Sequence, residues 1–395
     1  MQTPPDLAQA IARHERYAEF DPGNTALQLA LGDLYRQAGR LDAAQACYRR
    51  CLEADPAGSA ARSRLAAVEL ALHRFTEAEA LLRPLLESGD RSPALLHNLG
   101  LALHQQQRYE EAAGLFAEAA EAGMALPANE AWLARALHHL GRMQEACQAA
   151  RRWLDLDGSR EARSYLALLY ADDGDTESGL GLAREVLAED PDDVDANVVA
   201  GIWSMEQQRS DAARTHYASA LRREDGNGRA WLGMGLVHLY EQEYRQAVEA
   251  LGKAAAIHPD NAGIVATLGW ATLVAGDPAG ARAVFERAIE VEPNLAESHG
   301  GRAAALVWLG DLDGAQHGIR VAKRLDAASM GADIAKTMLL SAQGRQDDAA
   351  DTFARMLERR PAVHMEPMAE QLRLYFSKQA AAGRPSPAAR RPPTR

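Results

Sequence analysis

The sequence predicts an all-α solenoid, a stack of short antiparallel helix pairs, and two observations support this fold class. Pairs of small residues twelve positions apart, such as Gly32 with Ala44 and Gly235 with Ala247, recur with a period of 34 residues. Hydrophobic residues make up 47% of the 395 residues but aromatic residues only 6%, so the core is built mainly from Ala and Leu. A period of this length is typical of proteins whose helix pairs bury their apolar faces by stacking.

The register places ten repeats over residues 25–363, and all but one of them are 34 residues long. Their first residues are Thr25, Ser59, Pro93, Pro127, Arg160, Val194, Gly228, Ala262, Ala296 and Met330. Small residues at positions 8, 20 and 27 let the two helices of a repeat approach closely, and large residues at positions 4, 7, 11 and 24 fill the remaining space. Proline at position 32 ends the second helix, because it lacks an amide hydrogen and clashes with the preceding turn.

This pattern resembles the tetratricopeptide repeat. The seventh repeat carries it most clearly, through Trp231, Met234, Gly235, Ala247, Leu251, Ala254 and Pro259. The resemblance implies a right-handed α-α superhelix in which the first helix of each pair lines a concave groove. It also implies that positions 2, 5, 9, 12 and 13 face the groove, and that the groove binds a protein or peptide partner.

The residues that flank the repeats are expected to cap the stack. In residues 1–24, the stretch from Pro5 to Phe20 aligns with a lone second helix. Residues 364–379 contain an amphipathic stretch from Pro367 to Gln379, which is predicted to form a capping helix over the last repeat. Residues 380–395 carry four Arg and four Pro without a large apolar residue, so a disordered basic tail is expected.

Apolar residues dominate the expected groove of repeats six to ten. They include Ile202, Met205, Leu236, Leu239, Tyr240, Trp270, Leu273, Trp308 and Met338. A contiguous apolar patch tends to mark an interaction surface, so we predict that a partner binds here, with Trp270 and Trp308 as its main anchors. The alternative is that some of these side chains pack against the neighbouring repeat or against the opposite side of the groove.

The expected groove of repeats three to six is polar. Its candidate residues are His97, His104, Arg135, His138, His139, Glu161, Asp172, Asp195 and Glu206. They are interpreted as solvated groove residues, or alternatively as contacts to a ligand, a pH-sensitive cluster or a metal site, although the histidines lack Cys or acidic ligands at a recognisable spacing. A catalytic pair of His138 or His139 with Asp172 is a further alternative.

The net charge of −12 is concentrated in one segment, since residues 155–195 contain thirteen acidic residues and three Arg. Asp-rich turns are ordinary helix boundaries, and this is one interpretation. The other is a landing site for a basic partner segment, which would also disfavour nucleic acid as a partner. A calcium site is a weaker alternative, because the acidic run lacks the distal glutamate of a twelve-residue calcium loop.

The remaining features predict a protein without cofactor or metal. Its three cysteines are expected to pack in the core rather than to serve redox chemistry. No apolar stretch is long enough to cross a membrane and no signal segment is visible, which predicts a cytoplasmic location. The cations are nearly all Arg, which indicates a bacterial origin.

Motifs of phosphate-binding loops, nucleophile elbows and zinc-binding helices are absent, so no enzyme is predicted. The residues with which tetratricopeptide co-chaperones bind the C-terminal carboxylate of heat-shock proteins are missing. The row of asparagines at position 6 that is found in glycosyltransferases of the O-linked N-acetylglucosamine type is also missing, since repeats three to five carry Asn98, Trp132 and Tyr165 there. The sequence therefore predicts a protein-protein interaction module that acts as a scaffold or assembly factor, for instance in an envelope or polysaccharide machine. Alternatives are a chaperone for a secreted or membrane-inserted client and an enzyme-associated regulatory subunit.

Overall fold

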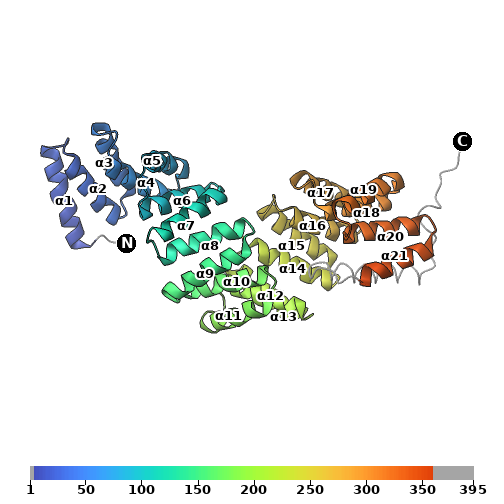
Figure 1. Ribbon diagram of the computed structural model, residues 1–395. Coiled ribbons are helices and arrows are strands. Elements are labelled where there is room, and N and C mark those ends of the chain that lie inside the picture. Colours follow the sequence, from blue (N-terminus) through green and yellow to red (C-terminus); the bar gives the residue numbers. More distant parts are fainter. Residues whose placement is uncertain (1–3, 359–395) are drawn as a thin grey trace. The chain divides into compact units, whose positions relative to one another are not determined.

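The structure is a computed structural model that describes residues 4–358, and helices are the only regular elements of that range (Figure 1). These residues form two compact parts, residues 4–174 and residues 175–358, which we call the N-terminal part and the C-terminal part. The N-terminal part contains α1 (Pro5–Phe20), α2 (Thr25–Gln37), α3 (Leu41–Ala54), α4 (Ser59–Ala71), α5 (Phe75–Glu87), α6 (Pro93–Gln105), α7 (Tyr109–Glu121), α8 (Pro127–His139), α9 (Met143–Asp157) and α10 (Arg160–Asp172).

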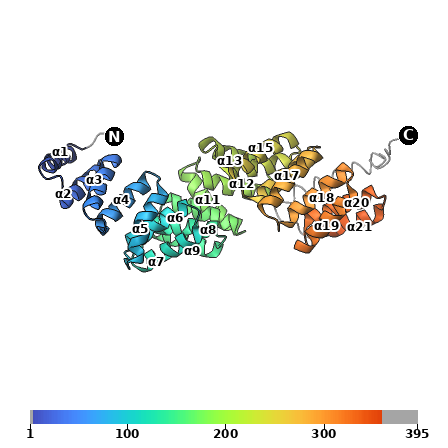
Figure 2. The same ribbon diagram turned by 90° about the horizontal axis from the view of Figure 1, so that it is seen from above.

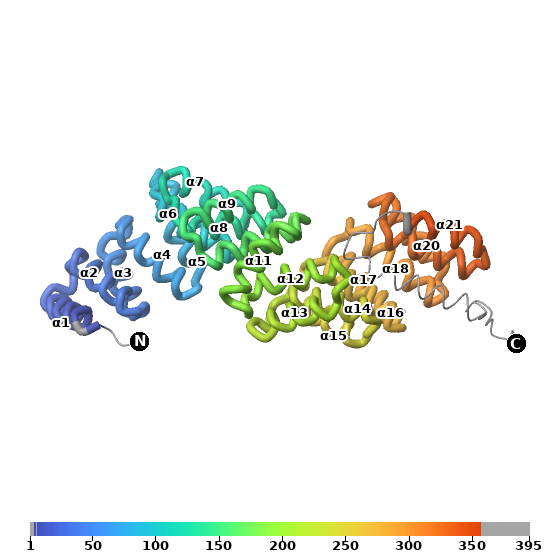
Figure 3. Tube along the Cα trace, turned by 90° about the horizontal axis from the view of Figure 1, so that it is seen from below, coloured from blue at the N-terminus to red at the C-terminus, as the bar shows by residue number. Residues whose placement is uncertain are grey.

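The C-terminal part continues with the same alternation of first and second helices. It contains α11 (Thr176–Glu189), α12 (Val194–Glu206), α13 (Ser210–Arg223), α14 (Gly228–Tyr240), α15 (Tyr244–Ile257), α16 (Ala262–Val274), α17 (Pro278–Val291), α18 (Ala296–Leu309), α19 (Leu312–Leu325), α20 (Met330–Ala342) and α21 (Gln346–Glu358). Within each part, helices that follow one another in sequence pack side by side, as the two further views show (Figures 2 and 3).

The ten first residues of the predicted repeats are the first residues of the ten even-numbered helices from α2 to α20. Side-chain caps explain several of these starts. Asn227 accepts a hydrogen bond from the Ala230 amide at 2.9 Å, and Asn261 accepts one from the Ile264 amide at 3.0 Å. Such caps satisfy amides that the first helical turn leaves without a partner.

The turn between the two helices is also the same in every repeat. Position 15 has a positive φ in all ten repeats, and it is Gly in six of them. The other four carry His73, Gln107, Gln208 and Gln242. Residues other than glycine adopt this left-handed conformation at a cost in free energy. The packing of the two helices that the turn joins must therefore impose it.

The core confirms the predicted pairing of small and large positions within a repeat. A Cβ atom added to Gly32 would lie 2.5 Å from the Tyr48 ring, and one added to Gly269 would lie 2.7 Å from the Phe285 ring. The rings of Tyr48 and Phe285 are fully buried. Position 8 is therefore small because the ring at position 24 occupies the space that a side chain would need.

The predicted capping helix over residues 364–379 and the predicted tail over residues 380–395 lie outside the described residues. Between residues 4 and 358, no helix is long and apolar enough to cross a membrane. Cys47, Cys51 and Cys147 are buried and free.

Candidate functional site

The predicted apolar groove residues divide into two groups by exposure. Leu239, Trp270, Leu273 and Met338 are buried, with Trp270 only 1% exposed. Ile202, Met205, Leu236 and Tyr240 are half-buried, and Trp308 is 38% exposed. Only the second group has surface that a partner can contact, so the alternative of packing between repeats holds for the first.

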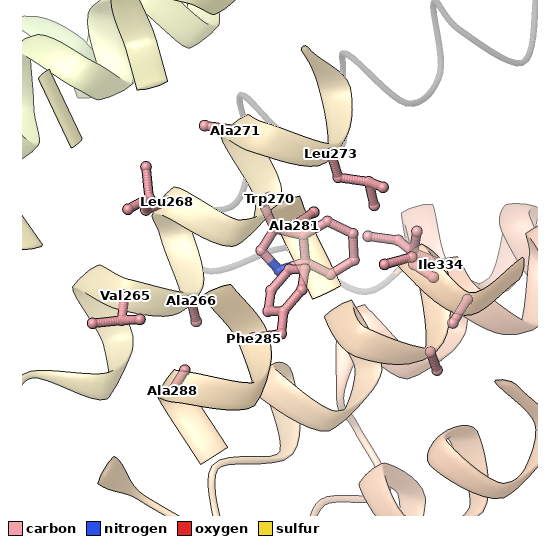
Figure 4. Close-up of a cluster of buried hydrophobic side chains, with 14 of the residues drawn as sticks. Val265, Ala266, Leu268, Trp270, Ala271, Leu273, Ala281, Phe285, Ala288 and Ile334 are labelled. Atoms are coloured by element: carbon pink, nitrogen blue, oxygen red, sulfur yellow. The ribbon is translucent and has the colours of Figure 1, made fainter. Parts of the chain in front are cut away.

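The expectation that Trp270 is an accessible anchor is wrong. Its indole packs edge-on against Phe285, with ring centroids 5.3 Å apart, and lies in one buried cluster with Leu273 and Ile334 (Figure 4). A Cβ atom added to Gly331 would lie 3.2 Å from the Trp270 ring. The indole thus fills space between α16, α17 and α20, and it contributes to stability rather than to a binding surface.

Two glycines explain why this part of the expected groove is closed. A Cβ atom on Gly300 of α18 would lie 2.4 Å from the Gly331 carbonyl carbon and 2.5 Å from the Ala332 amide nitrogen of α20. The two helices therefore approach through their backbones, and α18 packs much more extensively on α20 than α12 packs on α14. This close approach covers side chains that would otherwise line a groove.

Six of the accessible apolar residues at the expected groove positions form what we call the concave apolar row. It consists of Ile202, Met205, Leu236, Tyr240, Val274 and Trp308. These residues occupy positions 9, 12 and 13 of α12, α14, α16 and α18, which are the groove-facing positions implied by the family resemblance. These side chains leave apolar surface in contact with water at equivalent positions of successive helices, and water solvates such surface poorly.

The polar candidates of the N-terminal part form a cluster of aromatic and cationic side chains. The Arg135 guanidinium lies 5.3 Å from the Trp132 ring centroid and 5.1 Å from those of Trp153 and Tyr165. It also donates to Glu161 at 2.8 Å. Three ring faces and one carboxylate hold this guanidinium in place, so it is a fixed positive charge.

His138 joins two members of this cluster. Its Nδ1 lies 2.9 Å from the Tyr165 hydroxyl, and its Nε2 lies 2.9 Å from Asp172 Oδ2. The imidazole and the carboxylate are both largely buried, at 14% and 17% exposure. These contacts tie α8 to α10 and fix the orientation of the ring.

His104 lies at the centre of the same cluster and is 8% exposed. Its ring makes edge-to-face contacts with Tyr109, Trp132 and His139, at centroid distances of 5.1, 4.9 and 5.6 Å. Neither ring nitrogen has a hydrogen-bond partner among the described residues. Burial, together with the nearby His139 and Arg135, lowers the pKa of His104 from 6.5 to about 4, so the imidazole is neutral near pH 7.

Acidification is therefore expected to destabilise the N-terminal part through His104. The unfolded chain binds this proton below about pH 6.5, whereas the folded chain resists it down to about pH 4, so the free energy of unfolding falls as the pH falls through this window. Between pH 7 and pH 4.5 the wild type should lose about 2 kcal/mol more stability than His104→Phe, measured by urea denaturation. If His104→Phe lost as much stability as the wild type between these two pH values, the buried imidazole would not be the source of the pH dependence.

The other polar candidates are separate from this cluster or lie at its edge. His97 contacts the Asn129 side-chain oxygen at 3.0 Å, and His139 is exposed and stacks on Tyr109 at 4.2 Å. Asp195 and Glu206 lie on α12 in the C-terminal part, where Glu206 accepts a hydrogen bond from Thr176 at 2.9 Å. Within residues 4–358, no three His, Cys, Asp or Glu side chains are placed so that they could hold a metal ion.

Sequence reasoning missed the aromatic members of the cluster. Trp132 and Tyr165 both occupy position 6 of their repeats, and Tyr109 and Trp153 come from the second helices α7 and α9. The signal was present in the consecutive aromatic residues at position 6, next to groove histidines on the same helices. Contacts between first and second helices of different repeats could not be read from the period.

The acidic segment serves several local functions in the C-terminal part. Asp175 and Asp193 cap α11 and α12 by accepting amide hydrogen bonds at 3.1 Å. Asp190 and Asp192 form ion pairs with the last two arginines of α13, at 2.7 and 3.1 Å. These contacts agree with the interpretation of Asp-rich turns as helix boundaries.

Comparison with known families decides the identity of the repeats. A family model described as tetratricopeptide repeat matches residues 37–100 and 238–294, and two other models with the same description match residues 204–262 and 94–122. The chain is a tetratricopeptide repeat protein. Its helix pairs form the all-helical solenoid of that family.

One curated relative of this tetratricopeptide repeat protein is the type IV pilus assembly protein PilF of Pseudomonas aeruginosa. The two are 28% identical over 141 residues, which are 35% of this chain and 56% of PilF. The chain thus spans about half the length of this relative.

Two solved structures are similar to this tetratricopeptide repeat protein over most of the chain. The APC/C hetero-tetramer Cut9-Hcn1 has a TM-score of 0.52 at 15% identity, covering 95% of this chain and 82% of that one. A monomeric mutant of IFIT1 with Gppp-AAAA has a TM-score of 0.51 at 15% identity, covering 89% and 95%. At such low identity the likeness shows the fold alone.

Proposed function

We propose that this tetratricopeptide repeat protein binds a segment of a partner polypeptide on the concave apolar row and acts as a non-catalytic scaffold or assembly factor. The observation that carries the proposal is the register of half-buried apolar side chains on α12, α14 and α16, which continues to the exposed Trp308 on α18. Burying such side chains under a partner gains about 25 cal/mol per Å² of apolar surface removed from water.

The chemistry of the row indicates the kind of segment that fits it. Leu236 and Ile202 favour apolar side chains, and the ring of Tyr240 adds aromatic contact area. Asp195 and Glu206 lie on the same helix as Ile202 and Met205, so basic residues beside the apolar ones are favoured. The partner segment is therefore amphipathic and carries Lys or Arg.

The similarity to a pilus assembly protein favours the role of an assembly factor over that of a client chaperone or a regulatory subunit. No observation on the described residues favours a client chaperone or an enzyme-associated regulatory subunit. The proposed role does not require a cofactor.

A photo-crosslinking experiment tests the binding surface. Leu236 is replaced by p-benzoylphenylalanine in the native host, and the adducts formed on illumination are identified by mass spectrometry. We expect a polypeptide adduct that is lost when Met205→Asp is added, because that change places a charge on the neighbouring helix of the row.

The matched control places the same crosslinker at Val248, which is also half-buried and apolar but lies on α15, the second helix of the same repeat. This position should not give the adduct. If both positions trap the same polypeptides, or Leu236 traps none, the concave apolar row is not the partner site.

A further inference from the structure

The last 37 residues of the chain contain a segment that matches the chemistry inferred for the partner. Met368, Leu372, Tyr375 and Phe376 follow the i, i+4, i+7, i+8 spacing of one apolar helix face. Residues 359–395 also carry eight Lys or Arg against two Glu, although the whole chain has a net charge of −12. Within residues 367–379 the charged residues are Arg373, Lys378 and Glu370. An amphipathic segment with a small positive charge, flanked by further arginines, is thus covalently attached to an acidic body that has an accessible apolar row.

The segment is long enough to reach the row. The described chain ends at Glu358 in α21, and eight residues separate it from Pro367. Eight extended residues span at most about 28 Å, and packed helices lie about 8–10 Å apart, so this linker reaches back over α18 and α16. Residues 367–379 as a helix would be about 20 Å long, which is enough to cover two or three neighbouring first helices.

Three apolar side chains of the row lie within reach of this segment. Trp308 on α18 is 38% exposed, and Val274 on α16 and Tyr240 on α14 are half-buried. All three occupy position 13 of consecutive repeats, so they lie in register along the array. An apolar helix face laid across these helices would remove all three side chains from water.

We propose that residues 367–379 dock on the concave apolar row over α14, α16 and α18. A tethered segment has an effective concentration in the millimolar range. It therefore excludes weak ligands from the row, and a partner that binds more tightly displaces it. The docking itself stands on the row and the segment alone, whereas its regulatory effect rests on the proposed function.

The test uses the purified full-length protein with p-benzoylphenylalanine at position 376, an aromatic replacement of Phe376. Illumination followed by digestion and mass spectrometry should give adducts within α14, α16 or α18 of the same chain. Leu372→Asp should lower the yield at least tenfold without affecting the repeats, because this residue lies beyond them. The same crosslinker at Thr394 is the control and should give no specific adduct.

Three outcomes would overturn the docking. Adducts confined to α20 and α21 would mean that the segment caps the last repeat, as its amphipathic sequence predicts. Adducts only between chains, recognised in a mixture of ¹⁴N- and ¹⁵N-labelled protein, would mean that the segment binds a second copy. The absence of any specific adduct from position 376 would mean that the segment binds neither.

The regulatory effect is tested separately with a variant that ends at Ala362 and carries the crosslinker at Leu236. Its yield of partner adduct should be at least fivefold higher than that of the full-length chain. If the intramolecular adduct forms but no partner adduct does, the proposed function fails and the docking stands. If partner adducts form equally with and without residues 363–395, the docking has no regulatory role.

Discussion

Replacing Trp270 with Ala is expected to destabilise the C-terminal part by about 4 kcal/mol. The indole is 1% exposed and packs against Phe285, and truncation of a buried Trp removes its transfer free energy and leaves a cavity between α16, α17 and α20. Urea denaturation followed by far-UV circular dichroism measures the loss.

Trp308→Ala provides the matched comparison, because Trp308 also lies on a first helix but is 38% exposed. Its removal should cost less than about 1 kcal/mol, as is usual for partly exposed sites. If the two variants were equally stable, Trp270 would not be the buried side chain that the structure shows. A binding defect in Trp270→Ala is not informative on its own, since it would follow from unfolding.

Gly300→Ala is expected to cost about 3 kcal/mol, although a Gly to Ala change inside a helix normally stabilises. The added Cβ would lie 2.4 Å from the Gly331 carbonyl carbon, and backbone atoms cannot move aside as a side chain can. The two helices must therefore separate, which loosens the packing around Trp270. Thermal and urea denaturation should both report the loss.

Gly252→Ala in α15 is the control, since a Cβ atom at Gly252 meets nothing within 4 Å. It should stabilise by about 0.5 kcal/mol through helix propensity alone. Opposite signs for the two substitutions would demonstrate that backbone contact, and not helix propensity, governs Gly300. A gain in both would contradict the close approach of α18 and α20.

The period predicted the helix starts because each depends on local rules. Position 8 is small since the ring at position 24 of the same repeat fills that space, as in Gly269 with Phe285, and this pairing is visible within 17 residues of sequence. The exposure of the groove was predicted less well. Periodicity indicates which face of a helix turns inward, but it contains no information on how far apart neighbouring first helices lie.

That distance depends on residues from two different repeats. Gly300 occupies position 5 of one repeat and Gly331 position 2 of the next, and only their juxtaposition closes α18 onto α20. The cluster around His104 has the same origin, because its partners Trp132 and His139 belong to the next repeat.

The backbone contact between α18 and α20 also makes the C-terminal part unevenly stiff. Helices separated by side chains can slide or tilt as rotamers change, whereas helices that touch through glycines have no such layer to deform. Bending of this part should therefore concentrate among α12, α14 and α16. The part of the concave apolar row on α12, α14 and α16 would therefore adjust to partners of different thickness, while Trp308 on α18 would keep its position relative to α20.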